Sequence, residues 1–217
     1  MEEEFMWFVR LISTDKEGEQ IVERLRLDGI SCSEDDETPL LSIILASSED
    51  SLKHLNMSSL RQNNRQKIVL LQTSGIFDID EQHFFNAILS FPQNDDVYNQ
   101  IKSFLYCAYN FIDVHSIISV DFSDFYSIIS GRNIITMQQY VYTTDVEDAL
   151  SQLKYDKTNK QDKYIYAIRG AQSQEEEGKQ LKTFDKHLST ELCGEEFKFN
   201  IVAGEQRQVF LLTATPY

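Results

Sequence analysis

Two aspartates, Asp121 and Asp124, stand three residues apart where a helix is expected to begin, in the segment 119–124 that reads SVDFSD. Residues at this spacing lie on one helix face, so both carboxylates would point the same way from a single turn. A carboxylate can accept a proton from water or orient it through metal-bound solvent. The pair could therefore orient or deprotonate a water molecule. Alternatively, Asp121 caps the helix and the positive helix end favours Asp124; the residues alone leave both interpretations open.

The other residue types that often carry chemistry are scattered along the chain. Histidines occur at positions 54, 83, 115 and 187 without an H-E-x-x-H motif, and the cysteines at 32, 107 and 193 form no C-x-x-C pair. Their odd number and spacing indicate neither a disulfide framework nor a zinc site. We therefore expect no metal site, no cofactor and no self-contained active site. The protein is expected not to be an enzyme on its own.

The composition excludes several classes of partner. A net charge of −15 repels polyanions, so neither nucleic acid nor an anionic membrane surface is an expected partner. The longest apolar runs, such as residues 40–46, are much shorter than the ~20 residues that a membrane helix needs. The first ten residues, MEEEFMWFVR, are acidic where a signal peptide is basic. These two features lead us to expect a cytoplasmic protein. With 41% hydrophobic residues, the chain is expected to fold around a substantial core.

The elements that would position Asp121 and Asp124 alternate between strands and helices. In the first half, the apolar runs at 5–12, 40–46 and 67–72 predict buried strands. A helix is expected after Thr14 and Glu17, which fit a capping box, and before Gly29, which suits a helix C-terminus. A second, short helix is expected over 48–55. This β-α-β-α-β order predicts a parallel sheet.

A long amphipathic helix is expected next, over 95–113, followed by a second helix over 122–130. The remaining residues predict strands at 133–142, 164–169, 197–203 and 208–215. Helices are expected after Thr144 and Ser173, the second with Leu181, Phe184 and Leu188 facing the core. Gly204-Glu205 predicts a hairpin between the last two strands.

This order of elements resembles the tubulin/FtsZ superfamily. The best local match is Ser119-Val120-Asp121-Phe122-Ser123-Asp124 against the family pattern N-x-D-F-A-D, with serine in place of asparagine. The closing residues 199–217 resemble the family's final hairpin, and the similarity covers about 94–217 convincingly and 5–30 faintly. The resemblance implies an α/β fold with a shortened parallel-sheet domain (1–92), a central helix and catalytic-type loop (93–131) and an FtsZ-like α+β C-terminal domain with a mixed four-stranded sheet (132–217).

The sequence departs from this family where GTP would bind. The family holds phosphate with glycine-rich turns, yet this chain contains no two adjacent glycines. After the first strand it reads Ser13-Thr14-Asp15-Lys16-Glu17-Gly18-Glu19, whose acids would repel a triphosphate by several kcal/mol at ~4–5 Å. The resemblance therefore implies a degenerate nucleotide cleft at Ser13, Thr14, Lys16 and Gly18. Asp95 and Asp96 lie where the family often contacts the guanine base. They are either part of this degenerate cleft or ordinary acids at a helix start.

In the family, GTP bound by one subunit is hydrolysed with acids that the next subunit supplies. By this resemblance, Asp121 and Asp124 would act in trans on a partner's nucleotide. The leading hypothesis is a protein that lacks GTPase activity and interacts with a tubulin/FtsZ-like filament, or with copies of itself, through these acids. One alternative is a non-polymerising binding or structural module, and another is a degenerate protein that still binds GTP weakly.

Overall fold

The computed structural model describes residues 4–33, 39–56, 60, 66–79, 84–93, 96–112, 121–191, 194 and 196–217. Within them the strands are β1 (Glu4–Met6), β2 (Val9–Ser13), β3 (Ile30–Cys32), β4 (Leu41–Ala46), β5 (Lys67–Gln72), β6 (Ala87–Ser90), β7 (Gly131–Val141), β8 (Lys163–Ala171), β9 (Glu196–Ala203) and β10 (Gln208–Pro216). The helices are α1 (Lys16–Leu27), α2 (Glu49–Leu52), α4 (Val97–Ile112), α5 (Phe122–Ile129), α6 (Val146–Leu150) and α7 (Gln174–Glu191).

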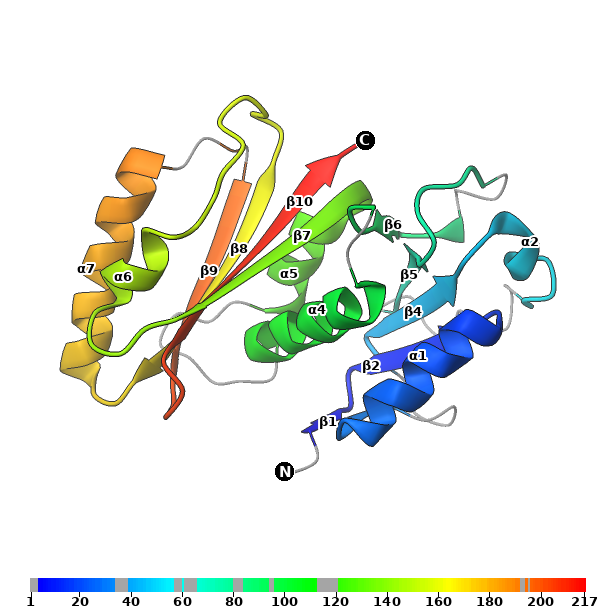
Figure 1. Ribbon diagram of the computed structural model, residues 1–217, viewed down its shortest axis with the longest axis horizontal. Coiled ribbons are helices and arrows are strands. Elements are labelled where there is room, and N and C mark those ends of the chain that lie inside the picture. Colours follow the sequence, from blue (N-terminus) through cyan, green and yellow to red (C-terminus); the bar gives the residue numbers. More distant parts are fainter. Residues whose placement is uncertain are drawn as a thin grey trace. The chain divides into compact units, whose positions relative to one another are not determined.

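The chain forms two compact units. The first comprises 1–102 and 130–134, and the second comprises 103–129 and 135–217. Helix α4 and strand β7 each contribute residues to both units (Figure 1). The division into 1–92, 93–131 and 132–217 that the resemblance implied stays a prediction.

The first unit is built on a parallel sheet. Its strand order is β2-β4-β5-β6 and then the start of β7, with all four neighbouring pairs parallel. The predicted strands at 40–46 and 67–72 are confirmed as β4 and β5. Strand β6 was not predicted, although its short apolar run before Pro92 is a recognisable signal. Helix α1 packs on β2 and β4.

The first predicted strand, 5–12, is wrong as a single element. A turn at Trp7 and Phe8 divides it into β1, which pairs in parallel with β3 in a separate small sheet, and β2 of the main sheet. The Trp7 carbonyl at this turn lies outside the strands and accepts a hydrogen bond from Ser33 Oγ. The turn therefore does not leave this backbone acceptor unsatisfied. Trp7 is 45% exposed, whereas Phe8 is fully buried.

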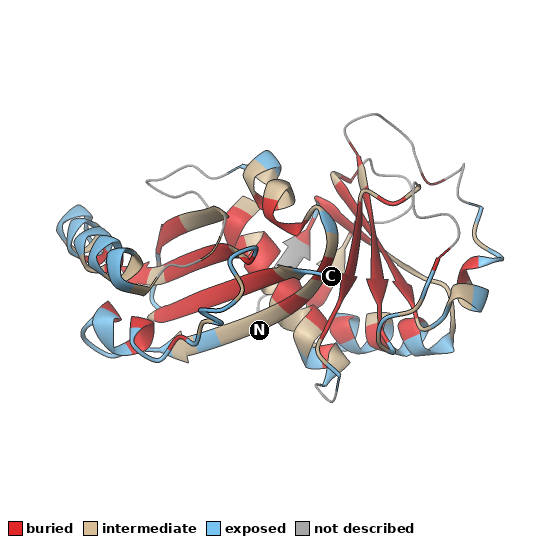
Figure 2. Ribbon diagram, turned by 90° about the horizontal axis from the view of Figure 1, so that it is seen from above, coloured by how far each residue is buried: buried red, intermediate tan, exposed pale blue. Residues whose placement is uncertain are grey.

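The central strands of this sheet are buried along most of their length, as their red ribbons in Figure 2 show, so the core of the first unit lies on both faces of the sheet. One cluster is formed by Ile44, Ala46, Leu52, Leu60, Ile68, Leu70, Ile79, Phe85 and Ile88. Successive residues of a strand point to opposite faces, so Ile43, Leu45 and their neighbours face the other side, where α1 packs. Continuous apolar runs therefore made these strands predictable.

The second unit contains the rest of β7 beside β10, β8 and β9, in that order. Strand β8 lies between β9 and β10, being parallel to β9 and antiparallel to β10. The predicted hairpin at Gly204-Glu205 is therefore wrong, since its two strands do not pair. The connection instead runs past the end of β8 at Gly170, whose φ is +116° and where an added Cβ would lie 2.6 Å from Arg207 Cγ.

Helices cover both faces of the sheet in the second unit. One cluster joins α6 and α7 to alternate residues of β8 and β10, including Tyr164, Tyr166 and Val209. Helix α5 contacts β8 and β9 (Figure 1). On α7, Phe184 is buried as predicted, but Leu181 is 39% exposed and Gln180 takes the buried position instead.

The two helices expected around the acidic segment are confirmed as α4 and α5. Ile101, Phe104, Leu105 and Ala108 of α4 are fully buried, and Phe125 of α5 contacts both Phe104 and Phe111. This packing fixes α5 and therefore the position of its first turn. In the part of the chain that the structure describes, no helix is long and apolar enough to cross a membrane.

Candidate functional site

The turn between β2 and α1 is closed by the carboxylate of Asp15. One oxygen, Oδ1, accepts a hydrogen bond from Gly18 N at 2.9 Å. The other, Oδ2, accepts from Ser47 N at 2.9 Å and from Ser47 Oγ at 2.8 Å. Asp15 is thus the N-cap of α1, in place of the predicted Thr14, and it joins the turn after β2 to the turn after β4.

Thr14 makes a second connection between these turns. Its Oγ1 lies 3.0 Å from the Leu45 carbonyl and 2.9 Å from Ser51 Oγ. Ser51 Oγ in turn donates to the Ser48 carbonyl at 2.7 Å. The polar groups at these carboxyl ends of β2 and β4, the place where α/β sheets bind ligands, are thus engaged with one another.

The remaining predicted residues of this turn have different surroundings. Gly18 is buried, and an added Cβ would lie 3.1 Å from Ser13 Cβ and 3.3 Å from Leu45 Cβ. Its lack of a side chain therefore allows α1 to approach the sheet closely. Lys16 is exposed at the first position of α1. Glu17 accepts a hydrogen bond from Ser74 Oγ at 2.9 Å.

The hydrogen bonds to Asp15 stabilise its charged form. Burial raises the pKa of this carboxyl, but the donors from Gly18 and Ser47 outweigh burial and lower the pKa below its ordinary value. Asp15 therefore carries a negative charge at neutral pH, at the positive end of α1.

Asp96 caps α4. Its Oδ1 accepts from Asn99 N at 3.3 Å and its Oδ2 accepts from Asn99 Nδ2 at 2.9 Å. Among the described contacts, those of Asp96 stay within its own helix, and Asp95 lies outside the described residues. A cavity of about 240 Å³ borders the start of α4, lined by Gln72, Thr73, Ser74, Gly75, Phe91, Pro92, Gln93 and Val97.

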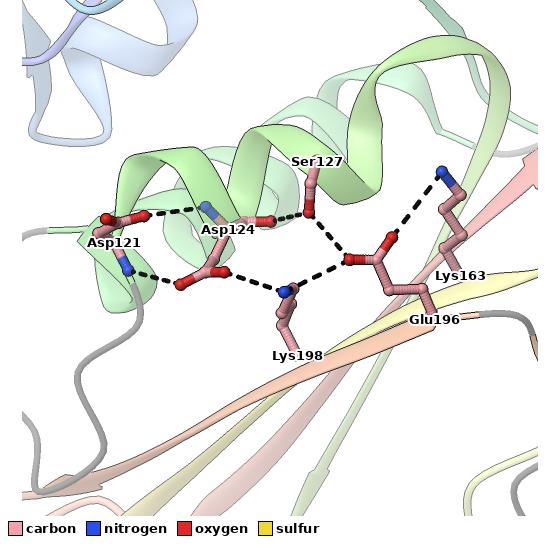
Figure 3. A network of polar contacts seen from close by, with 6 residues as sticks. All are labelled: Asp121, Asp124, Ser127, Lys163, Glu196 and Lys198. Carbon is pink, nitrogen blue, oxygen red and sulfur yellow. Dashed lines mark hydrogen bonds and ion pairs between the residues drawn. The ribbon is translucent and has the colours of Figure 1, made fainter.

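Asp121 and Asp124 form a reciprocal cap at the start of α5 (Figure 3). Asp124 N donates to Asp121 Oδ1 at 3.0 Å, and Asp121 N donates to Asp124 Oδ2 at 3.4 Å. The structure thus brings both predicted acids together on one helical turn, and Asp121 is exposed. Ser119 and Val120 of the matching segment lie outside the described residues.

Asp124 also forms an ion pair with the sheet. Lys198 Nζ of β9 lies 2.9 Å from Asp124 Oδ1 and 3.4 Å from Glu196 Oε1. Ser127 Oγ lies 2.8 Å from the Asp124 carbonyl oxygen and 3.2 Å from Glu196 Oε1, and its single hydroxyl proton can be donated to either acceptor. Figure 3 shows these groups as one network between α5 and the strands. The Lys198 ammonium is the main reason that the pKa of Asp124 is lowered, and Asp124 correspondingly raises the pKa of Lys198.

The sequence did not indicate Ser47 or Lys198 as partners of acids. Each is distant along the chain from the acid it contacts, and a lone serine or lysine has no pattern that marks a partner. Asp15 was noted only as a charge that would repel phosphate. An aspartate followed by an expected helix is itself an N-cap signal, so its capping role was predictable.

Comparisons with known proteins identify the fold. No protein-family model and no curated protein matches the sequence. Among solved structures, CetZ from Methanosaeta thermophila strain DSM 6194 is similar over 93% of this chain and 67% of its own, with a TM-score of 0.57 at 12% identity. TubZ of Clostridium botulinum phage c-st is similar over 100% of this chain and 93% of its own, with a TM-score of 0.50 at 11% identity.

The chain therefore has a tubulin/FtsZ-like fold, as the resemblance implied. At these identities the likeness defines the fold alone, because one fold carries many functions. What the chain does has to be argued from its own residues.

Proposed function

We propose that this chain is a tubulin/FtsZ-like protein that does not hold GTP at its own α1 turn and interacts with a filament of such proteins through the start of α5. The observation that carries the first part is the Asp15 carboxylate at the N-terminus of α1. The fold likeness to CetZ and TubZ supports a partner of the same superfamily.

A phosphate group at this turn would compete with Asp15. Helix N-termini bind anions through backbone N–H groups, and here the Gly18 and Ser47 N–H groups already bind a carboxylate. A triphosphate would also lie beside Glu17 and Glu19 in the first turn of α1. Like charges at ~4 Å repel by ~4 kcal/mol at an effective dielectric of about 20. These contacts support a turn that no longer accepts nucleotide.

The start of α5 is the proposed contact surface. Asp121 is exposed there, and the next turn of the helix is anchored by Phe125, which is fully buried against Phe104 and Phe111. In a head-to-tail assembly, a subunit with only one of the two complementary faces can join a chain but cannot extend it. The protein would thus modulate a filament, for example by capping it.

The nucleotide part of the proposal is tested by thermal unfolding with GTP and Mg²⁺. A ligand that binds only the native state at 100 times its Kd adds about 2.7 kcal/mol of stability. We expect no change in Tm at millimolar GTP. A rise in Tm would instead identify the chain as a weak GTP binder, and the GTP-free interpretation would be wrong.

The filament part is tested by co-sedimentation with an FtsZ polymer assembled with GTP. The chain is expected to pellet with the polymer, and Asp121→Asn is expected to reduce the pelleted fraction. Asparagine also caps helices, so this variant removes the charge while retaining the cap. Asp145→Asn, at the N-cap of α6, makes the same change elsewhere and should pellet like the unaltered chain. If Asp121→Asn pelleted as fully as Asp145→Asn, the start of α5 would not be the contact surface.

The cavity beside α4 favours a second candidate, a non-polymerising binding module. It lies where β5 and β6 end, which is a usual place for ligands in an α/β sheet. Its lining is largely uncharged and its volume of about 240 Å³ is small for a ligand site. Failure to pellet with any superfamily polymer would favour this candidate.

A further inference from the structure

We infer that Lys198 is a positioning residue that keeps Asp124 bound within the chain, so that the α5 surface presents Asp121 to a partner without offering a second carboxylate for GTP hydrolysis. The inference rests on the proposed function for its partner, but the withdrawal of Asp124 by Lys198 can be measured in the isolated chain.

The two acids of the reciprocal cap differ in their surroundings. Both oxygens of Asp124 have partners, Lys198 Nζ for one and Asp121 N for the other. Asp121 is exposed and receives its described hydrogen bond from Asp124 N. The side chains of Asp124 and Lys198 are 36% and 29% exposed, so this ion pair is partly shielded from water.

An ion pair reduces what Asp124 can do for an external substrate. A carboxylate that orients or deprotonates water needs its lone pairs directed at that water. Lys198 takes up one oxygen and compensates the charge, and the lowered pKa makes the carboxylate a weaker base.

The surrounding contacts keep Lys198 in place. Glu196 lies on the same strand face as Lys198, two residues away, and contacts both Lys198 and Ser127. On its far side, Glu196 Oε2 lies 4.0 Å from Lys163 Nζ. The ammonium of Lys198 is therefore held between two carboxylates, of which Asp124 is the nearer.

These contacts predict a specific regulatory consequence. The unaltered chain should bind a GTP-loaded filament end and leave the rate of GTP hydrolysis unchanged, as a non-hydrolytic cap. Removing the ammonium should release the Asp124 carboxylate toward the partner and allow it to act together with Asp121.

The first experiment measures the carboxylate in the isolated chain. Carbodiimide-driven coupling of glycine ethyl ester at pH 6 labels accessible carboxyl groups, and tandem mass spectrometry separates Asp121 from Asp124. Lys198→Gln is expected to raise the labelling rate of Asp124 severalfold and to leave that of Asp121 nearly unchanged. Lys198→Arg retains the positive charge and should restore protection. Lys179→Gln, which removes an ammonium paired with Glu175 on α7 and leaves the Asp124 ion pair intact, is the matched control.

The second experiment adds an FtsZ polymer and measures pelleting and GTP turnover together. The unaltered chain and Lys198→Arg should pellet without altering turnover. Lys198→Gln should pellet and raise turnover above that of the polymer with the unaltered chain, by a factor that grows with the ratio of chain to FtsZ. Because only the capped filament ends are affected, the rise is smaller than the ~10²–10⁴-fold that a positioned acid–base group contributes at one site.

The two experiments separate the possible failures. If the unaltered chain does not pellet, the proposed function is wrong, while the labelling rates still decide whether Lys198 withdraws Asp124. Equal labelling of Asp124 in the unaltered chain and in Lys198→Gln would overturn the inference. It would also be overturned if Lys198→Gln showed faster labelling of Asp124 in the first experiment and pelleted in the second, but left GTP turnover unchanged.

Discussion

Replacing Asp15 by alanine would remove three described hydrogen bonds, two of them from the turn after β4. The loss of an N-cap costs ~0.5–2 kcal/mol, and a partly buried N–H left without a partner adds to this. We expect Asp15→Ala to lower the free energy of unfolding by about 2–3 kcal/mol in urea denaturation. Asp145 caps α6 through one described bond, to Glu147 N, so Asp145→Ala should cost about 1 kcal/mol. Equal losses for the two variants would mean that Asp15 does not join the turns.

Asp162 gives a prediction of pH dependence. It is 2% exposed, and its described hydrogen bonds come from the hydroxyls of Thr215 and Tyr164. Burial raises its pKa above the ordinary value, so the native state holds this proton more tightly than the unfolded chain does. Its ionisation therefore lowers stability as pH rises from the unfolded pKa through the folded one, and the full cost persists above it.

Asp162→Asn should relieve this cost. The variant is expected to gain stability relative to the unaltered chain as pH rises from about 4 to 8, measured by urea denaturation at each pH. Asp156 is a suitable control, because it is exposed and hydrogen bonds from Thr158 lower its pKa. The stability that this lowered pKa gives is already present above the unfolded pKa, so the relative stability of Asp156→Asn should change below about pH 4 and stay nearly constant from about 5 to 8. A relative stability of Asp162→Asn that is constant with pH would show that Asp162 keeps its ordinary pKa.

At the scale of elements, two glycines of the second unit should respond oppositely to alanine. Gly170 has a positive φ, and its added Cβ would lie within 2.7 Å of two atoms of Arg207, so Gly170→Ala should cost at least ~1–3 kcal/mol. Gly178 lies within α7 with no neighbouring atom within 4 Å of its added Cβ. Gly178→Ala should stabilise by ~0.5–1 kcal/mol. Urea denaturation measures both changes. If Gly170→Ala were tolerated, the connection between β9 and β10 would not pass as close to Gly170 as the structure shows.

Elements whose residues carry a local pattern were predictable from sequence. Strands β4 and β5 are continuous apolar runs, and α4 has a wide apolar stripe, so burial and periodicity identified each one. The hairpin prediction failed because strand order depends on pairing with β8, which is distant in sequence. Turn residues alone do not show which strands pair.

The candidate sites divide in the same way. The capping spacing of Asp121 and Asp124 is local, and both predicted interpretations placed them at a helix start. Lys198 is identified as a partner only by the packing of α5 against β9 in the structure. Ser47 is identified only by the pairing of β2 with β4. Tertiary partners of single charged or hydroxyl residues leave no trace in one sequence.

For the whole molecule, the net charge of −15 is the dominant electrostatic feature. Described ion pairs such as Lys53–Asp50 and Lys179–Glu175 join largely exposed side chains and stabilise little. Self-repulsion should therefore outweigh them, so that screening stabilises the native state. Raising NaCl from about 10 to 150 mM shortens the Debye length from about 30 to 8 Å. We expect Tm to rise by about 2–4 °C, equivalent to ~1 kcal/mol for a chain of this size.

Differential scanning calorimetry in NaCl and in choline chloride would test this. Equal rises in the two salts attribute the effect to ionic strength, whereas a rise in NaCl alone would indicate specific sodium binding. A fall of Tm in both would mean that the ion pairs outweigh the repulsion. The same repulsion predicts that duplex DNA at about 50 mM salt leaves Tm unchanged, since binding to it requires clustered basic residues that release counterions. A partner for this protein would then bind through features other than a polyanionic backbone. A protein surface complementary to the exposed Asp121 would have such features.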